Sequence, residues 1–499
     1  MSEKKIADSI ALPSIVSEIR SVLPQADAYL VGGAVRDSLL GRPVCDIDIA
    51  LRGDGVQAAR AVANALGAAC YPLDSERGVG RVILARGNVR YTLDFASLRG
   101  GTIEADLAAR DFTINAIAIP LSRPEERIDP LSGSRDLRDG ILRACSPSAL
   151  RDDPVRVIRA VRLATQLDLH LEEETQAQTR AGATGLANVS AERIRDEFFR
   201  ILVGKRVAAG IRLLSALGIL PRILPETAGL EKTVQPAPHR YDVWTHTLMA
   251  VENLEVLLNR LVRDSSDVSS SNPPMDQAVA QLKRFHPTLM DQLARPISDD
   301  RPAFGLMFLA ALLHDSAKTD TRSINSAGEV HFLGHEQLGE ERALERATAL
   351  RFSREEAGYT AQIVRHHLQP MLLRVGGEIT RRAVFRYFRS TGPSGVAVCL
   401  FSLADLLATY GPHLPPSEWK AALAVVVPLL EGYFERGAEI VHPVPFLSGN
   451  DLIREFGLAP GPQIGELLDT LREAQAAGEV GTRENALTLV SRGLGRHTD

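Results

Sequence analysis

A change of hydrophobic period near residue 146 limits what this chain can fold into more than any other feature. Between residues 28 and 120, short apolar runs that suit strands alternate with helical patterns, whereas beyond residue 146 helical periodicity takes over. A substantial sheet is therefore expected only in the N-terminal part, and the remainder must be built from helices. Because 499 residues exceed what one core supports, we expect an α+β head followed by separate helical domains.

The head shows a clear order of elements. We expect strands at 28–33 and 45–51, a short helix at 34–41 and a longer helix at 55–66. The runs 81–86 and 89–98 alternate polar and apolar residues and are joined by Gly87-Asn88, which predicts a β-hairpin.

The strand at 45–51 carries two aspartates in an otherwise apolar run. Asp46 and Asp48 lie two residues apart, so both project from the same face. Adjacent carboxylates repel one another unless a cation lies between them, and Mg²⁺ takes oxygen ligands. Asp94, on the polar face of the hairpin strand, can reach the same cation as a third carboxylate or a general base. The pattern predicts a Mg²⁺ site.

The two aspartates could also be solvated side chains at the end of a strand. A pair of glycines favours the Mg²⁺ site over that alternative. Gly32 and Gly33 stand at the turn from the first strand into the short helix, where backbone N–H groups can approach a phosphate. A phosphate cradle beside metal-binding carboxylates suits nucleotidyl transfer, in which metal ions stabilise the attacking and leaving oxygens.

The segment GGAVRDSLLGRPVCDIDIA (32–50) resembles the first motif of class II tRNA nucleotidyltransferases, the CCA-adding enzymes, and of their bacterial poly(A) polymerase relatives. The family's further motifs follow in order: DLAARDFTINAIA (106–118), GSRDLRDGILRA (133–144), DDPVRVIRAVRLA (152–164) and SAERIRDEF (190–198). The resemblance implies a polymerase-β-like head that uses CTP and ATP to extend the 3′ end of tRNA.

The resemblance also implies residue roles. Asp46 and Asp48 would bind the catalytic metal ions, Arg110 and Asp111 the triphosphate and ribose, and Asp153 and Arg156 the edge of the base. Asp153 and Arg156 lie three apart on a helix expected to begin at Asp152, and a carboxylate beside a guanidinium can pair with cytosine or adenine. The other nucleotide-binding residues implied by the motifs are Gly32, Gly33, Arg36, Asn115, Arg159 and Arg162.

Two departures from the family pattern matter. Ala109 stands where the family usually has a further arginine before Arg110. Only LRGGTIEA (98–105) separates the Asp94 strand from the second motif, where family members usually carry a longer flexible loop associated with switching from C to A addition. The short segment resembles the CC-adding subgroup, and addition of CC and of complete CCA both stay open.

Histidine and aspartate recur through the helical region in the order H…HD…H…H…D, which resembles the HD phosphohydrolase superfamily, as does HDSAK (314–318). The residues are His246, His314, Asp315, His335, His366 and Asp405. The resemblance implies that imidazole and carboxylate ligands bind Mn²⁺, Ni²⁺, Zn²⁺ or Mg²⁺ beside a water nucleophile. In the family, such a domain hydrolyses 2′,3′-cyclic phosphodiesters or phosphomonoesters at RNA ends.

The domain boundaries follow from these motifs. We expect a nucleotidyltransferase head at 1–145, a helical neck at 146–230, an HD domain at 231–420 and a helical tRNA-binding tail at 421–499. In the tail, Pro460-Gly461-Pro462 is expected to end a loop and open a helix. The segment 263–276, rich in Ser, Asp and Pro, is expected to be a mobile loop.

Composition and charge indicate which partners and which cellular compartment to expect. A net charge of −5 gives no global basic field, so any RNA-binding surface must be local. The four cysteines are scattered, no signal-peptide pattern opens the chain and no apolar run reaches membrane-span length, which favours the cytoplasm and no membrane partner. Two alternatives remain: a poly(A) polymerase, and an HD phosphohydrolase whose N-terminal domain only binds nucleotide or RNA.

Overall fold

The computed structural model describes residues 12–23, 27–74, 78–87, 89–262, 272–298, 301–374 and 377–495. Two compact units divide the chain: the first contains residues 1–197 and 213–222, and the second contains residues 198–212 and 223–499. Asn88 of the expected hairpin turn and residues 263–271 of the expected loop lie outside the described residues. The expectation of a loop is wrong for residues 273–276, which form the first turn of helix α13 (Pro273–Leu282).

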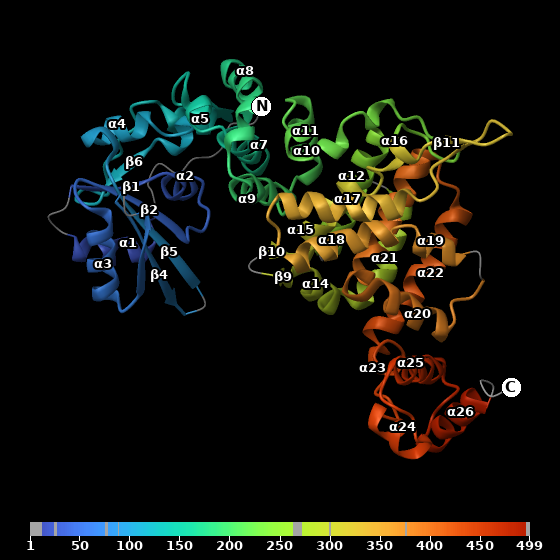
Figure 1. The fold of residues 1–499 in the computed structure, drawn as a ribbon. Helices are drawn as coiled ribbons and strands as arrows, with labels where there is room; N and C mark the ends of the chain where they lie inside the picture. The colour runs from blue at the N-terminus through green and yellow to red at the C-terminus, as the bar shows by residue number, and fades with distance from the viewer. Residues whose placement is uncertain are drawn as a thin grey trace. The chain divides into compact units, whose positions relative to one another are not determined.

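Within the described part of the first unit, six strands form one mixed sheet in the order β3-β4-β5-β2-β1-β6 (Figure 1). The strands are β1 (Ala28–Val31), β2 (Asp46–Leu51), β3 (Ala69–Asp74), β4 (Val79–Arg86), β5 (Val89–Ser97) and β6 (Ala118–Pro120). β2 and β5 run parallel, while the other neighbours pair antiparallel. The expected hairpin is confirmed, with Arg86 opposite Val89.

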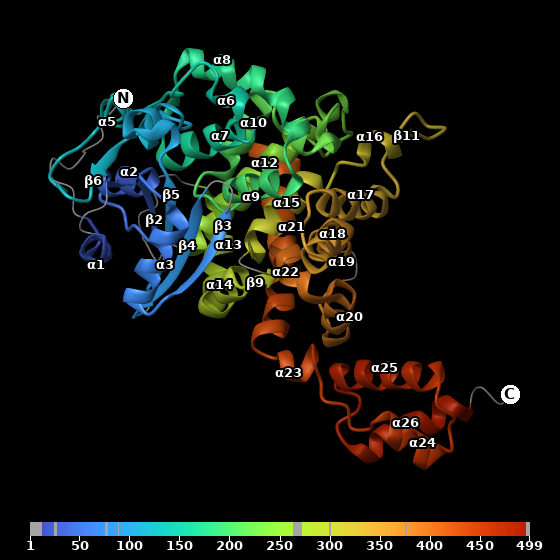
Figure 2. The same ribbon diagram turned by 60° about the vertical axis from the view of Figure 1, so that its left-hand side comes forward.

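Helix α3 (Gly55–Leu66) covers part of this sheet by packing against β3, β4 and β5 (Figure 2). Its N-cap is Asp54, whose carboxylate accepts the backbone N–H groups of Val56 and Gln57, and its C-cap is Gly67 in the left-handed conformation. The short helix α2 (Gly33–Leu39) follows β1 directly. The expected strands and helices between residues 28 and 66 are thus confirmed.

Further helices of this unit lie after β5. They include α4 (Ile103–Ala108), α5 (Gly133–Asp139), α6 (Ala149–Asp152), α7 (Arg156–Leu167), α8 (Glu173–Gly182) and the first part of α9 (Ala191–Leu202). The prediction that a helix begins at Asp152 is wrong. The helix α6 ends at Asp152, and Asp153 is extended, with φ −142° and ψ 91°. Pro154 explains the break, since the residue before a proline disfavours helical dihedrals.

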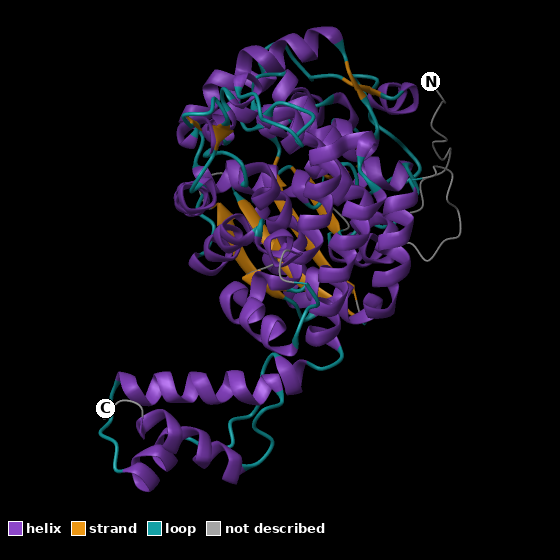
Figure 3. Cartoon of the chain, turned by 90° about the vertical axis from the view of Figure 1, so that its right-hand side faces the viewer, coloured by secondary structure: helices purple, strands orange, loops and turns teal. Residues whose placement is uncertain are grey.

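The second unit is dominated by helices (Figure 3). Its core helices include α12 (Val243–Val262), α15 (Ala303–Leu313), α17 (His335–Ala349), α18 (Arg354–His366) and α21 (Gly395–Tyr410). Every side of α15 is apolar and nearly all of it is buried, so the helix runs through the middle of the unit and delivers His314 to the interior.

The C-terminal helices of this unit surround an apolar cluster of their own (Figure 2). They are α24 (Gly449–Phe456), α25 (Pro462–Ala477) and α26 (Arg483–Gly495). Gly461 is the N-cap of α25, so the expected helix opening at Pro462 is confirmed. Contacts from α25 to α20 (Arg381–Thr391) and α23 (Gly437–Ile440) attach this group to the rest of the unit.

One stretch of the second unit, Arg381–His413, is long and apolar enough to cross a membrane by composition. The most apolar part of this stretch is 89% buried inside the protein, as is typical of helices in a protein core.

Candidate functional site

Three carboxylates meet on neighbouring strands of the head. The parallel register of β2 and β5 sets Asp48 beside Asp94 and Asp46 beside Thr92. Burial, together with the nearby charges of Asp94 and Asp46, raises the pKa of Asp48 to about 6, although Arg110 opposes the rise. A divalent cation bound here would neutralise the carboxylates and make ionisation of Asp48 favourable, so the cluster suits such a cation.

Asp94 is more constrained than the sequence implied. Its two carboxylate oxygens accept hydrogen bonds from Nε and Nη2 of Arg81, each at 2.7 Å. Arg81 faces Asp94 across the β4–β5 hairpin, and the paired carboxylate raises the pKa of the guanidinium. Asp94 therefore stands beside Asp48 as a carboxylate held by an arginine, an arrangement that favours a fixed charge over a general base.

Gly32 lets the backbone lie close to both the Asp48 carboxylate and the Arg110 guanidinium. Its φ of +75° favours glycine, and a Cβ at this position would lie 3.0 Å from Asp48 Oδ2 and 3.0 Å from Arg110 Nη1. Nε and Nη2 of Arg110 donate to Asp106, which holds its guanidinium beside Gly32. A side chain here would fill the space where a bound phosphate could approach.

Most of the other predicted nucleotide-binding residues form one hydrogen-bonded chain. Arg36 donates to Asn115 (2.7 Å), Asn115 to Asp111 (3.0 Å) and Arg159 to Asp111 (3.1 Å). Burial favours a higher pKa for Asp111, but the charge of Arg159 and the hydrogen bond from Asn115 outweigh burial and lower this pKa. The buried Glu197 completes the chain by accepting from Arg159 and Arg162.

Sequence reasoning missed Glu197. The residue stands within the SAERIRDEF segment, four positions after Arg193, and this spacing places both on the face of α9 that meets α7.

Asp153 and Arg156 line a cavity of about 1290 Å³ together with Arg99, Asp152 and Arg193. Asp153 Oδ2 lies 3.7 Å from Arg156 Nε, so the predicted pair is formed. The guanidinium of Arg156 donates to backbone carbonyls of Ala109, Arg110 and Ala149 at 3.1–3.4 Å. Three backbone acceptors therefore fix the orientation of Arg156.

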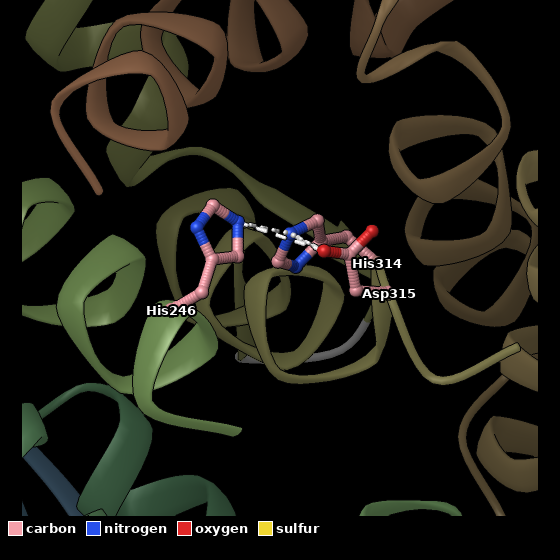
Figure 4. Close-up of side chains that lie close together, drawn as sticks. All are labelled: His246, His314 and Asp315. Atoms are coloured by element: carbon pink, nitrogen blue, oxygen red, sulfur yellow. Dashed lines mark hydrogen bonds and ion pairs between the residues drawn. The ribbon is translucent and has the colours of Figure 1, made fainter. Parts of the chain in front are cut away.

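A second cluster lies inside the helical unit, around Asp315 (Figure 4). His246, His314 and Asp315 form one potential metal-binding group, and Asp315, His335 and His367 form another. Nε2 of His314 lies 3.2 Å from Asp315 Oδ2 and 3.3 Å from Nε2 of His246. Asp405 joins the first group, with Oδ1 2.9 Å from His246 Nε2.

The prediction of His366 as a ligand is wrong, because its neighbour His367 faces the cluster. His367 is 1% exposed and its Nε2 lies 3.9 Å from Asp315 Oδ1, whereas His366 is only partly buried. Successive helical residues point about 100° apart, so only one of two adjacent histidines can face a given site.

The donor set fits a metal ion. Nδ1 of His314, His335 and His367 each lies 2.7–2.9 Å from a backbone carbonyl, so Nδ1–H donates and Nε2 is the nitrogen that faces Asp315 and is placed to bind a metal ion. Asp315 Oδ1 and His335 Nε2 are buried and have no hydrogen-bond partner among the described residues, while Asp315 Oδ2 lies 2.7 Å from Lys318 Nζ. Burial favours a lower pKa for His314, but the charges of Asp315 and Asp405 outweigh burial and raise this pKa to about 10.

Two further side chains lie at this cluster: His239, which sequence reasoning missed, and Lys318 of the HDSAK segment, which is buried although a surface position was the safer expectation. The ring of His239 lies 5.3 Å from that of His246, and burial lowers the pKa of His239 to about 4. Lys318 is buried, its Nζ donates to Gln235 and lies 2.7 Å from Asp315 Oδ2.

Comparison with known families gives two matches. The family described as "Poly A polymerase head domain" matches residues 28–143. The family described as "Probable RNA and SrmB- binding site of polymerase A" matches residues 168–230.

Two solved structures share the fold across nearly the whole chain. The Thermotoga maritima CCA-adding enzyme complexed with tRNA has a TM-score of 0.58 and 22% identity, and covers 97% of this chain and 96% of its own. A CCA-adding enzyme complexed with CTP has a TM-score of 0.62 at the same identity and coverage. These likenesses confirm the expected α+β architecture with its polymerase-β-like head.

Curated relatives match with higher identity. The A-adding tRNA nucleotidyltransferase of Deinococcus radiodurans is 35% identical over 93% of this chain and 95% of its own length. The CC-adding tRNA nucleotidyltransferases of Geobacter sulfurreducens and Thermus thermophilus are 32% and 33% identical, over 96% and 92% of this chain and 94% and 92% of their own. The chain therefore belongs to the family of tRNA nucleotidyltransferases.

Proposed function

We propose that this chain adds nucleotides to the 3′ end of tRNA from a nucleoside triphosphate bound at the carboxylate edge of the head. The observation that carries the proposal is the convergence of Gly32, Asp48 and Arg110, in which a carboxylate that could hold a cation and a guanidinium that could bind phosphate meet a backbone free of a side chain. Such a site suits an in-line transfer of a nucleotidyl group.

The residues divide the work of this reaction. Asp46 and Asp48 would hold Mg²⁺, which when bound lowers the pKa of the attacking ribose hydroxyl and neutralises charge on the phosphates. Arg110 binds the triphosphate, and the Arg36–Asn115–Asp111 chain orients the sugar. Asp94 contributes a fixed negative charge, because Arg81 already engages both of its oxygens.

Base selection falls to Asp153 and Arg156, and we propose that the base read is cytosine. Three backbone carbonyls hold Arg156 in one orientation, which supports the recognition of a single base shape. Cytosine offers an amino donor with N3 and carbonyl acceptors, whereas adenine is larger and lacks the carbonyl. The short segment 98–105 leaves little chain to shift the pair between bases, which supports addition of CC without the terminal A.

Addition of the terminal A alone is the second candidate, because the Deinococcus radiodurans relative that matches 93% of the chain is named an A-adding enzyme. The deciding experiment supplies tRNAs that end in the discriminator base, C or CC, each with labelled CTP or ATP. We expect CMP incorporation on the first two and a stop at CC. Efficient AMP incorporation on tRNA ending in CC would overturn this choice, and long A tails on unrelated RNA would identify a poly(A) polymerase.

We further propose a metal-dependent phosphohydrolase at the second cluster. His246, His314, Asp315, His335, His367 and Asp405 would hold one or two divalent ions, and a bound ion would supply an activated water. The buried Lys318 lies where it can orient a substrate phosphate. The test is hydrolysis of 2′,3′-cyclic AMP and of a 3′-phosphorylated RNA with Mn²⁺, Ni²⁺, Zn²⁺ or Mg²⁺, with Asp315→Ala as the control. Activity unchanged in that variant would rule the cluster out.

The remaining assignments are proposals of organisation. We propose the head, neck and HD domains predicted above, with α24–α26 as a tRNA-binding tail. The predicted boundary between residues 420 and 421 falls inside the helix α22 (Pro416–Phe434), so the tail begins after that helix. All four cysteines lie in described parts of the chain and are free thiols, which supports a cytoplasmic location.

A further inference from the structure

The charged face of α9 contacts the base-reading region at two points, Asp153 before α7 and the arginines of α7 itself. Arg193 and Glu197 are four residues apart on α9 and therefore share a face. Arg193 Nη2 donates to Asp153 Oδ2 at 2.8 Å. Glu197, with a side chain only 5% exposed, accepts from Arg159 and Arg162 on α7.

These two points differ in what they can control. Glu197 is buried and binds arginines whose place is also fixed by the packing of α7. Arg193 instead binds Asp153, which lies outside both α6 and α7 in an extended conformation. Few helical hydrogen bonds restrain Asp153, so its carboxylate depends on its side-chain partners for orientation.

Arg156 restrains Asp153 only weakly. Its Nε lies 3.7 Å from Asp153 Oδ2, beyond a normal hydrogen bond, and its Nη atoms donate to backbone carbonyls. The 2.8 Å contact with Arg193 therefore sets the rotation of the carboxylate and leaves Oδ1 to accept a hydrogen bond from a ligand.

We propose that Arg193 is a positioning residue for nucleotide selection: by fixing the Asp153 carboxylate it makes the Asp153–Arg156 pair accept one base and reject the other. The inference rests on the proposed base-reading function. Cytosine and adenine both present an exocyclic amino donor beside a ring-nitrogen acceptor, but the larger purine carries this edge farther from the sugar. With the sugar and triphosphate held in place, a carboxylate fixed in one rotation meets the amino group of one base, whereas a carboxylate free to rotate tolerates both.

The test compares Arg193→Gln and Arg193→Lys with the wild-type protein and with Arg135→Gln, a matched control on α5 whose arginine is 78% exposed and pairs with Asp139. The readout is the ratio of kcat/KM for CTP to that for ATP on one tRNA acceptor. We expect Arg193→Gln to bring this ratio about tenfold closer to one. Arg193→Lys should retain most of the discrimination, and Arg135→Gln should leave it unchanged.

A double variant separates positioning from other roles. If Arg193 acts through Asp153, Arg193→Gln should change the ratio little further in an Asp153→Ala background. An equal fall of kcat/KM for both nucleotides, with the ratio preserved, would overturn the inference and indicate a contact with RNA or a structural role. An equal change in both backgrounds would overturn it as well.

Failure of the proposed function has a different signature. Equilibrium binding of CTP and ATP analogues that cannot be transferred measures the ratio of the two dissociation constants, and therefore discrimination without the reaction. If the wild-type protein discriminates in binding but transfers nothing, the proposed activity is wrong while Arg193 stays testable. If Arg193→Gln binds the two analogues in the wild-type ratio, the inference is wrong even where transfer to tRNA is intact.

Discussion

At the scale of single residues, Asp48 is the position where burial and function are most directly opposed. Its pKa is raised to about 6 from an ordinary value of 3.8, mainly by burial. The folded protein therefore binds this proton more tightly than the unfolded chain does. Between about pH 4 and pH 6 the free energy of unfolding falls as pH rises, because the folded state must give up the proton.

The consequence is a pH-dependent loss of stability in metal-free protein. Relative to Asp48→Asn, the wild-type protein should lose a few degrees of melting temperature between pH 4 and pH 7, and saturating Mg²⁺ should restore part of the loss at pH 7. Thermal melts of both proteins with EDTA and with Mg²⁺ measure this. Parallel curves for the two proteins across the range would contradict the assignment.

Gly32 gives a second test at the same scale. In Gly32→Ala, the added Cβ lies 3.0 Å from both Asp48 and Arg110 and forces a φ of +75° on a residue that disfavours it. We expect nucleotide incorporation to fall by about a hundredfold or more, since a misplaced carboxylate affects every turnover. Gly41→Ala, also at positive φ but with no atom within 4 Å of the added Cβ, is the control for backbone strain alone. Equal losses in the two variants would mean that strain, and not crowding of the site, is responsible.

Single residues also show how far sequence reasoning reached. The strand period placed Asp46 and Asp48 together and set Asp94 beside them, because β register follows from alternation. The choice between His366 and His367 failed, since two adjacent histidines match a motif equally and only the rotation of α18 distinguishes them. Arg81, Glu197 and Arg193 were missed because each acts through a partner 13 to 40 residues away.

At the scale of elements, prediction succeeded where one face of an element is buried. The amphipathic α3 and the β4–β5 hairpin were found for this reason, whereas β3 was missed. β3 is an edge strand with Tyr71 and Leu73 exposed, so it lacks the alternation that marks a half-buried strand. The break between α6 and α7 was also missed, although Pro154 marks it.

The attachment of α25 to α20 is an element-scale feature with a measurable property. Arg382 and Arg386 pair with Glu473, and Arg389 pairs with Asp469. Exposed ion pairs contribute about 0–1 kcal/mol each and are screened by salt. The contact between the two helices should therefore weaken as ionic strength rises.

Glu473→Lys should have the same effect at low salt, because it removes two pairs and adds repulsion. We expect proteolysis between α23 and α24 to accelerate about fivefold in this variant, and in the wild-type protein at 1 M KCl. Glu466→Lys, at an exposed position on the same helix, is the matched control. A combined Arg386→Glu and Glu473→Arg exchange should restore part of the resistance. Cleavage that is independent of salt and of Glu473 would show that apolar contacts hold the two helices.

At the scale of the whole molecule, each cluster of candidate ligands is complete within its own compact unit. Asp46→Ala should abolish nucleotide incorporation and leave metal binding at the second cluster intact. Asp315→Ala should have the converse effect, because its carboxylate belongs to both potential metal-binding groups. Incorporation assays and metal titrations on both folded variants measure this. Loss of both properties in either variant would show that the two sites depend on one another.

The units are nevertheless interleaved along the chain. Residues 213–222 belong to the first unit, although residues 198–212 before them belong to the second. Any single cut therefore leaves at least one unit without one of its segments. In engineering terms, a cut at one junction removes a packing segment and no candidate ligand, because the first cluster lies before residue 198 and the second lies after residue 222. Each cluster is therefore expected to be separable from the other, at a cost in stability to the unit that loses its segment.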